Sequence, residues 1–228
     1  MEKIYKREDY LKKIRGFYKD DIIKVITGIR RCGKSYFLKS VIEELLENGI
    51  KEKDIIYIEL DKKEYKDIKT SKELEKIIDE KIIDNDFKYL FIDEVQNAKN
   101  FESLINAYRE EKNISIFITG SNSYLLSGEL VTKLTGRYIE IEMTTLSFYE
   151  YVDMKRFLNK SVNENIYLEF EEYIRNGGFP KSLDYDNYDE KILYTSSVIN
   201  QIFEKDIQTS NKIKDKALFE RIEKYIIN

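Results

Sequence analysis

The chain has 228 residues, of which 42% are hydrophobic and 36% charged, and its net charge at pH 7 is −4. This length and apolar content are typical of one large folded domain with a small appendage and exclude a disordered chain, while the negative charge argues against a protein that coats nucleic acid. The chain has no histidine and one cysteine, Cys32, so an internal disulfide, a Cys/His metal site and histidine-based catalysis are excluded.

The sequence shows no apolar N-terminal segment and no run of about 18 apolar residues that would span a membrane. We therefore expect a soluble cytoplasmic protein that makes no membrane contact.

Residues 7–18 carry apolar side chains at helical spacing and predict a short amphipathic helix. Five apolar runs then predict strands, at 22–26, 54–60, 87–93, 114–119 and 138–143. Helical patterns lie between the first four, at 34–48, 71–83 and 101–110, with Ser71 as the expected cap of the second. Strands separated by helices predict an α/β fold with a parallel five-stranded sheet, and the more alternating strand 138–143 is expected at its edge.

The alternation of predicted strands and helices ends after residue 143. Helical segments are predicted at 146–157, 162–175, 189–209 and 214–227. We therefore expect an α/β core over residues 1–143, a small helical lid over 144–210, and the start of a further domain over 211–228.

Residues 28–35 read G-x-x-x-x-G-K-S, the phosphate-binding P-loop or Walker A pattern, between a predicted strand and a predicted helix. Backbone N–H groups of such a loop point at phosphates, and Lys34 would reach the β- and γ-phosphates while Ser35 would take a Mg²⁺ position. The alternative, a chance glycine turn, is disfavoured by the flanking elements. The expected nucleotide-binding residues here are Gly28, Ile29, Arg30, Arg31, Cys32, Gly33, Lys34, Ser35 and Tyr36. The side chains of Arg30, Arg31 and Cys32 are expected to point outward.

An apolar strand also precedes the pair Asp93-Glu94, which fits Walker B. The Asp93 carboxylate would support Mg²⁺, and Glu94, just beyond the strand, would activate the attacking water. The alternative is a pair of solvated loop acids.

The fourth predicted strand ends in Thr119-Gly120-Ser121-Asn122, where a polar side chain would sense the γ-phosphate. Ser121 is the first choice and Asn122 the second, although capping of a following helix explains these residues equally well. For Arg7 and Tyr10, plain packing is favoured over contact with a nucleotide base.

Two further segments resemble parts of AAA-type ATPases. Arg137 precedes the fifth strand, where those enzymes place an arginine finger that acts on a neighbouring subunit, so a homo-oligomer is implied; a surface arginine is the alternative. Pro180, in a Gly-Gly-Phe-Pro turn, resembles the lid turn that meets adenine, with a helix connector as the alternative. Arg175 is favoured as a surface residue over a phosphate sensor.

The chain resembles the prokaryotic AAA-domain ATPases in six segments, which are, in order, Gly-Ile-Arg-Arg-Cys-Gly-Lys-Ser, Phe-Ile-Asp-Glu-Val-Gln, Ile-Thr-Gly-Ser-Asn, Leu-Thr-Gly-Arg, Leu-Ser-Phe-Tyr-Glu-Tyr and Gly-Gly-Phe-Pro. These are P-loop ATPases of the AAA and STAND-like archaeal type, and they usually carry a C-terminal domain of unknown function. The resemblance implies a protein or nucleic-acid partner that binds through that further domain.

The leading hypothesis is Mg²⁺-dependent ATP hydrolysis coupled to a conformational switch, with Glu94, Lys34 and Arg137 as catalytic residues. A nucleotide-dependent binding scaffold with little turnover is the alternative. A P-loop kinase of a small metabolite is disfavoured by the Asp93-Glu94 strand end.

Overall fold

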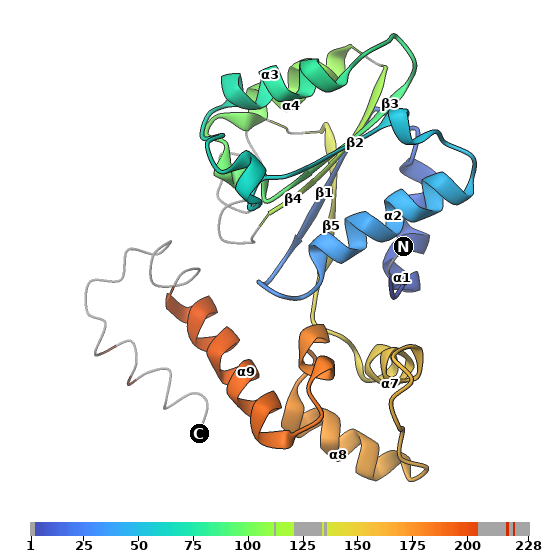
Figure 1. Ribbon diagram of the computed structural model, residues 1–228, viewed down its shortest axis with the longest axis vertical. Coiled ribbons are helices and arrows are strands. Elements are labelled where there is room, and N and C mark those ends of the chain that lie inside the picture. Colours follow the sequence, from blue (N-terminus) through green and yellow to red (C-terminus); the bar gives the residue numbers. More distant parts are fainter. Residues whose placement is uncertain are drawn as a thin grey trace.

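Five parallel strands in the order β2-β3-β4-β1-β5 form the centre of the computed structural model (Figure 1). The structure describes residues 3–111, 113–120, 134, 136–204, 218 and 221. The strands are β1 (Ile23–Gly28), β2 (Ile55–Glu59), β3 (Lys88–Asp93), β4 (Ile114–Thr119) and β5 (Tyr138–Met143). The predicted parallel sheet is confirmed, and β5 lies at its edge as its alternation indicated.

The register of the strands brings their carboxyl ends to one edge of the sheet. Ile26 of β1 pairs with Thr119, the last residue of β4, and Ile92 of β3 pairs with Ile118. Asp93 therefore lies beside Thr119, one strand away from the point where β1 leads into the P-loop. Polar side chains far apart in the sequence meet at this edge.

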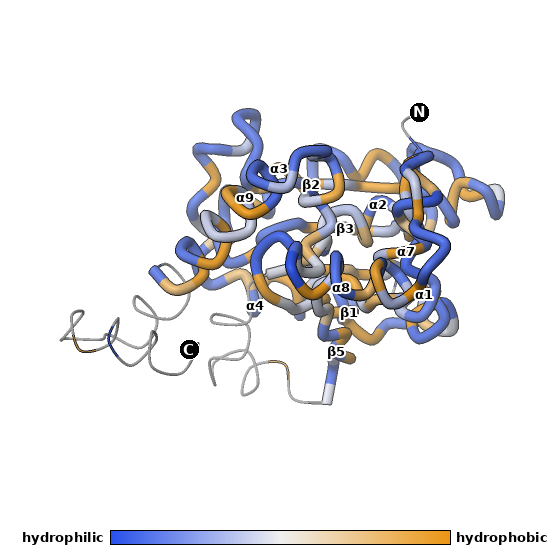
Figure 2. The backbone as a smooth tube through the Cα atoms, turned by 90° about the horizontal axis from the view of Figure 1, so that it is seen from below, coloured by the Kyte–Doolittle hydropathy of each residue, from blue (hydrophilic) through white to orange (hydrophobic). Residues whose placement is uncertain are grey.

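Helices cover both faces of the sheet, as an all-parallel sheet requires. The helices α1 (Glu8–Ile14) and α2 (Lys34–Glu47) pack on one face, where Leu11, Phe37 and Leu38 meet strand residues such as Phe91. On the other face lie α3 (Ser71–Lys81) and α4 (Phe101–Glu110). Figure 2 shows polar and apolar stretches following one another along these helices.

Local sequence explains most helix ends, with one correction. The N-cap of α3 is Thr70 and not Ser71, because Thr70 is extended, its hydroxyl accepts from the N–H of Glu73, and Glu73 reaches back in a capping box. Ser71 already belongs to the first turn. The helix α2 ends at its C-cap Asn48, and Gly49 follows with a φ of +84°, the left-handed conformation that commonly ends a helix.

A helical part follows the sheet and lies, in Figure 1, at the edge where β1 leads into α2. It consists of α7 (Phe148–Phe157), α8 (Ile166–Asn176), a 3₁₀ turn (Pro180–Asp184) and α9 (Tyr188–Gln201) around Leu146, Tyr151, Val152 and Leu183. The helices predicted over 146–157 and 162–175 are confirmed with later starts. Of the predicted segment 214–227 the structure describes residues 218 and 221 alone, and the end of 189–209, from residue 205, lies outside the described residues. The three-part domain division stays a prediction.

Within the described part of the chain, no helix combines the length and the apolar character that crossing a bilayer requires.

Candidate functional site

The loop between β1 and α2 has a backbone that only certain residues can adopt. Gly28 has a φ of +140°, Arg31 of +64° and Gly33 of +107°. A Cβ on Gly28 would lie 2.2 Å from the carbonyl oxygen of Met143, so β5 leaves no room for a side chain there. Gly33 is the N-cap of α2, and no side chain caps this helix or places an acid in its first turn. The positive end of α2 thus opens onto the loop.

Lys34 is held inside this loop. Lys34 is only 5% exposed, and its Nζ donates to the carbonyl oxygens of Gly28, at 3.0 Å, and Ile29, at 3.2 Å. Ser35 follows in the first turn of α2 and is half-buried, and Tyr36 is exposed. Two carbonyl oxygens of the loop therefore hold the ammonium group inside it.

The prediction that the side chain of Cys32 points outward is wrong. Cys32 is buried in the core on the α2 face, and its Sγ lies 2.9 Å from the position of a Cβ on Gly28. The carbonyl oxygen of Cys32 accepts a hydrogen bond from Nη1 of Arg7, at 3.3 Å. The reason for the inward orientation is the turn itself, since the positive φ of Arg31 redirects the following residue toward the sheet.

Asp93 and Glu94 meet Thr119 at the neighbouring strand end. The Thr119 hydroxyl donates to Oδ1 of Asp93 and accepts from the backbone N–H of Glu94, at 3.0 Å. Tyr57 of β2 adds a second donor, its hydroxyl lying 3.4 Å from Oδ2 of Asp93 and 3.3 Å from Glu59. The buried Asp93 carboxylate is therefore oriented from both neighbouring strands.

Glu94 departs from the strand in a left-handed conformation, with a φ of +57°. Nε2 of Gln96 donates to its Oε2. Burial raises the pKa of the Glu94 carboxyl above its ordinary value, while the charge of Lys34 and the Gln96 hydrogen bond act in the opposite direction. A carboxylate with a raised pKa in this position is a better proton acceptor than a solvated one.

These contacts fit an ATP–magnesium complex by the chemistry of their donors. The uncapped start of α2 and the Lys34 ammonium suit anionic phosphates. A hydroxyl from Ser35 and a carboxylate from Asp93 are the oxygen ligands that Mg²⁺ prefers.

The structure places the other predicted site residues differently. Pro180 lies beside the loop, since a Cβ on Gly33 would be 3.8 Å from its Cγ. Arg137 lies just before β5, at the amino-terminal ends of the strands and thus opposite to the P-loop. Its Nη1 donates to Oδ1 of Asn106 at 3.0 Å. It does not approach the P-loop of its own chain, and a role on a neighbouring subunit stays a prediction. Ser121 and Asn122 lie outside the described residues, and Arg175 is exposed.

Sequence reasoning missed three residues that the structure brings to this region, Tyr57, Gln96 and Thr119, and it assigned a fourth, Arg7, to plain packing. Thr119 carried a usable signal, because it is the last residue of its strand and strand ends line the crevice of an open sheet. Arg7, Tyr57 and Gln96 carried none that the sequence alone distinguishes from packing.

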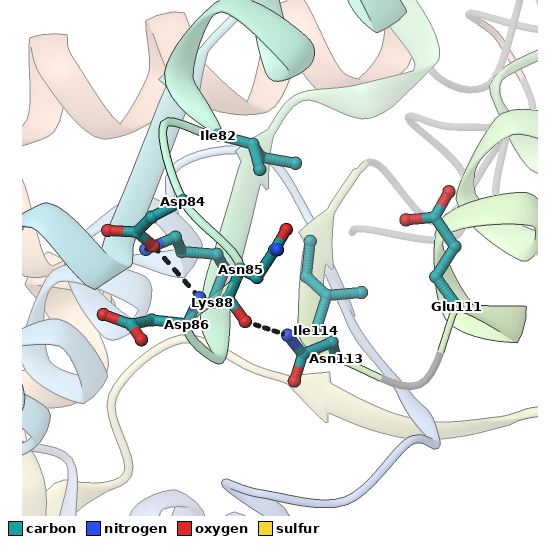
Figure 3. Close-up of a pocket in the computed structure, with 8 residues that line it drawn as sticks. All are labelled: Ile82, Asp84, Asn85, Asp86, Lys88, Glu111, Asn113 and Ile114. Atoms are coloured by element: carbon teal, nitrogen blue, oxygen red, sulfur yellow. Dashed lines mark hydrogen bonds and ion pairs between the residues drawn. The ribbon is translucent and has the colours of Figure 1, made fainter.

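A separate pocket lies at the opposite, amino-terminal ends of β3 and β4 (Figure 3), lined by Ile82, Asp84, Asn85, Asp86, Lys88, Glu111, Asn113 and Ile114. Together with Asp54, two of these acids form a carboxylate cluster. Lys53 pairs with Asp84 and Asp86, both at 2.8 Å, and Lys88 with Asp54, at 2.7 Å. The lysines already supply the positive charge that these carboxylates need.

Comparison with known proteins points to one family. Residues 20–152 match the family described as an AAA domain. An uncharacterized protein of Haemophilus influenzae is 37% identical over 219 residues, covering 95% of this chain and 54% of that protein. The uncharacterized protein MJ1544 of Methanocaldococcus jannaschii is 32% identical over 215 residues, covering 90% and 46%. The chain thus spans about half the length of these curated relatives.

A solved structure of C. elegans PCH-2 is similar in fold, with a TM-score of 0.51 and 14% sequence identity over 86% of this chain and 67% of that one. At this identity the likeness concerns the fold alone.

Proposed function

Because the chain belongs to the AAA domain family, we propose that it binds ATP with Mg²⁺ at the P-loop and hydrolyses the terminal phosphate with water. Membership of this family supports an activity of the ATPase type. The observation that carries the finer proposal is the Thr119 hydroxyl, which bonds both the Asp93 carboxylate and the backbone of Glu94 at the strand ends beside the P-loop.

Each residue has a role that follows from its chemistry. Lys34 and the N–H groups at the start of α2 hold the phosphates, and Ser35 and Asp93 hold the metal ion. When bound, Mg²⁺ neutralises charge on the phosphate oxygens. Glu94 orients a water molecule and accepts its proton on the carboxylate, which burial makes more basic. Thr119 holds Asp93 and the Glu94 backbone in place for both tasks.

We further propose that the helical part, α7 to α9, acts as a lid that reports the nucleotide state. The nearness of Pro180 to Gly33, where an added Cβ would lie 3.8 Å from the proline Cγ, supports this proposal. The output would be a change in the binding of a protein or nucleic-acid partner. Arg137, which faces away from its own site, would serve a neighbouring subunit in a homo-oligomer.

The test is ATP turnover and ATP binding by the wild type, Lys34→Ala and Glu94→Gln, with Glu75→Gln, an exposed acid on α3, as the control. We expect Lys34→Ala to lose binding, and Glu94→Gln to bind ATP while turnover falls about 10²- to 10⁴-fold, the usual contribution of a general base. The control should match the wild type. Equal turnover in all four proteins would contradict the site assignment.

The same experiment separates the two classes of function. ATP binding by the wild type without turnover would favour the binding scaffold. The mass in solution, measured with and without ATP, tests the role of Arg137, since a protein that is monomeric in every nucleotide state has no neighbouring subunit to act on.

A further inference from the structure

Arg7 lies at the junction of three segments that are far apart in the sequence. It belongs to the segment before α1 and is only 5% exposed. Its Nε and Nη2 form a two-pronged ion pair with the carboxylate of Glu150 in α7, at 2.8 and 2.7 Å. A guanidinium group bound in this planar manner is held in one orientation.

The remaining donors of Arg7 reach backbone carbonyl groups. Nη1 donates to Cys32 in the P-loop, at 3.3 Å, and to Thr144 after β5, at 2.7 Å. Nη2 donates to Thr145, at 3.2 Å. The five N–H groups of the guanidinium thus all have acceptors, which come from the P-loop, from the connection after β5 and from the first helix beyond it.

Glu150 continues this connection into the helical part. It is the N3 residue of the capping box of α7 and also accepts from the backbone N–H of Ser147, at 2.9 Å, and from its hydroxyl, at 3.0 Å. A further hydrogen bond connects the segment before α7 to the turn beside the P-loop, since the N–H of Leu146 donates to the carbonyl of Gly178 at 2.7 Å. The start of α7 therefore cannot shift without changing the contacts of Arg7.

From these contacts we propose that Arg7 is a positioning residue that couples the P-loop to the orientation of the helical part. The inference rests on the proposed ATP site. A shift of the Cys32 carbonyl, when phosphate groups bind to the loop, changes the position of the guanidinium and with it that of Glu150. Small displacements are passed on in this way where a packed junction has few alternative arrangements.

A purely stabilising role is the competing explanation, and the chain offers a matched control for it. Arg15 lies on the same N-terminal segment and also forms a two-pronged ion pair, with Glu44 of α2 at 3.1 and 2.7 Å, and a second one with Glu8. Its hydrogen-bond partners are carboxylates of α1 and α2 and not P-loop or α7 groups. Loss of Arg15 therefore removes a two-pronged ion pair of the same kind, although a more exposed one, without cutting the proposed connection.

The experiment uses the full chain and measures amide hydrogen exchange over residues 144–152, with and without Mg²⁺ and ATP, together with affinity for a fluorescent ATP analogue. The variants are Arg7→Met, Arg7→Lys, Glu150→Gln and the control Arg15→Met. We expect ATP to slow exchange in the wild type and in Arg15→Met. Arg7→Met should lose that response and bind the analogue roughly tenfold or more weakly, within the usual range of coupling between sites.

Arg7→Lys keeps the charge but not the planar fork, so it should also lose the response while folding normally. If Arg7→Met unfolds, this variant and Glu150→Gln decide the matter. A full ATP response in folded Arg7→Lys and Glu150→Gln would overturn the coupling role and leave the ATP site intact. A wild type that binds no ATP would overturn the proposed function and this inference with it.

Discussion

Pro180 packs beside Gly33, so that a Cβ on the glycine would lie 3.8 Å from Cγ of the proline. This is an ordinary van der Waals distance, which means that the space itself would accept a methyl group. What disfavours a side chain at Gly33 is its φ of +107°. The turn after α8 thus lies near the N-terminus of α2. Gly33 is needed for its backbone conformation, whereas at Gly28 the carbonyl oxygen of Met143 also leaves no room for a side chain.

We expect Gly28→Ala to destabilise the fold more than Gly33→Ala. Gly33→Ala meets backbone strain alone, costing about 1–2 kcal/mol, whereas a Cβ on Gly28 also lies 2.2 Å from the Met143 carbonyl oxygen. Urea unfolding of both variants measures the order. Gly16→Ala is the control, because nothing lies within 4 Å of its Cβ position and its φ is not positive. If Gly28→Ala were as stable as Gly16→Ala, β5 would have moved to make room for the methyl group, and the prediction would be wrong.

Replacement of Thr119 by valine should lower ATP turnover, and it should also cost about 1–3 kcal/mol of stability, because it takes a hydrogen-bond partner from the buried Asp93 carboxylate. Valine has nearly the same shape but cannot donate to Asp93 or accept from the N–H of Glu94. Turnover should fall about 10- to 100-fold, since misplacement of catalytic groups by 1 Å can have effects of this size. Thr119→Ser keeps the hydroxyl and should remain within a few-fold of the wild type. Equal losses in both variants would assign the effect to packing instead.

The pH dependence of turnover tests the environment of Glu94. Its hydrogen bond from Gln96 lowers a pKa that burial raises, so Gln96→Leu should raise the pKa of Glu94 further. Because the ionised carboxylate is the base, the acid limb of the pH–rate profile should move to higher pH. Gln201→Leu, on the exposed end of α9, serves as the control. A shift toward lower pH in Gln96→Leu would contradict the assignment.

Lys24 makes the stability of the fold depend on pH in the alkaline range. It is fully buried in β1, where its Nζ donates to the Asp20 carbonyl and the Ser115 hydroxyl, and burial lowers its pKa to about 8. Between about pH 8 and its ordinary value near 10.5, the unfolded chain binds more protons than the folded one, so stability rises with pH.

Lys24→Met removes this dependence. The wild type gains stability between pH 8 and pH 9.5, whereas the variant does not. The free energy of unfolding of Lys24→Met minus that of the wild type should therefore be higher at pH 8 than at pH 9.5, by roughly 1.5 kcal/mol from proton linkage. Urea unfolding at both values measures the difference. Lys88→Met is the control, because ion pairs with Asp54 and Asp84 raise the pKa of Lys88 despite its burial. The same difference in both variants would show that the dependence does not come from Lys24.

Hydrophobic periodicity and motif spacing predicted the elements of the α/β core well. The predicted ranges 101–110, 114–119 and 138–143 coincide with α4, β4 and β5. This succeeds because strand and helix patterns are local and because a parallel sheet needs apolar residues on both faces. Local reasoning was less exact where two neighbouring residues compete for one role, as Thr70 and Ser71 do at the start of α3.

By itself, the sequence determined that Gly28 to Ser35 carry a P-loop pattern between a strand and a helix, and that Asp93-Glu94 stand at the end of another strand, since these motifs are short and their chemistry lies in consecutive residues. Only the tertiary structure decided what surrounds them. Thr119 bonds the Asp93 carboxylate and the backbone N–H of Glu94 because β3 and β4 pair in a particular register. Cys32 turns inward because of a left-handed residue before it. Arg7 finds its acceptors at residues 32, 144, 145 and 150, which no spacing along the chain relates. A buried guanidinium group needs such acceptors wherever the fold can supply them, and only the folded chain brings them together.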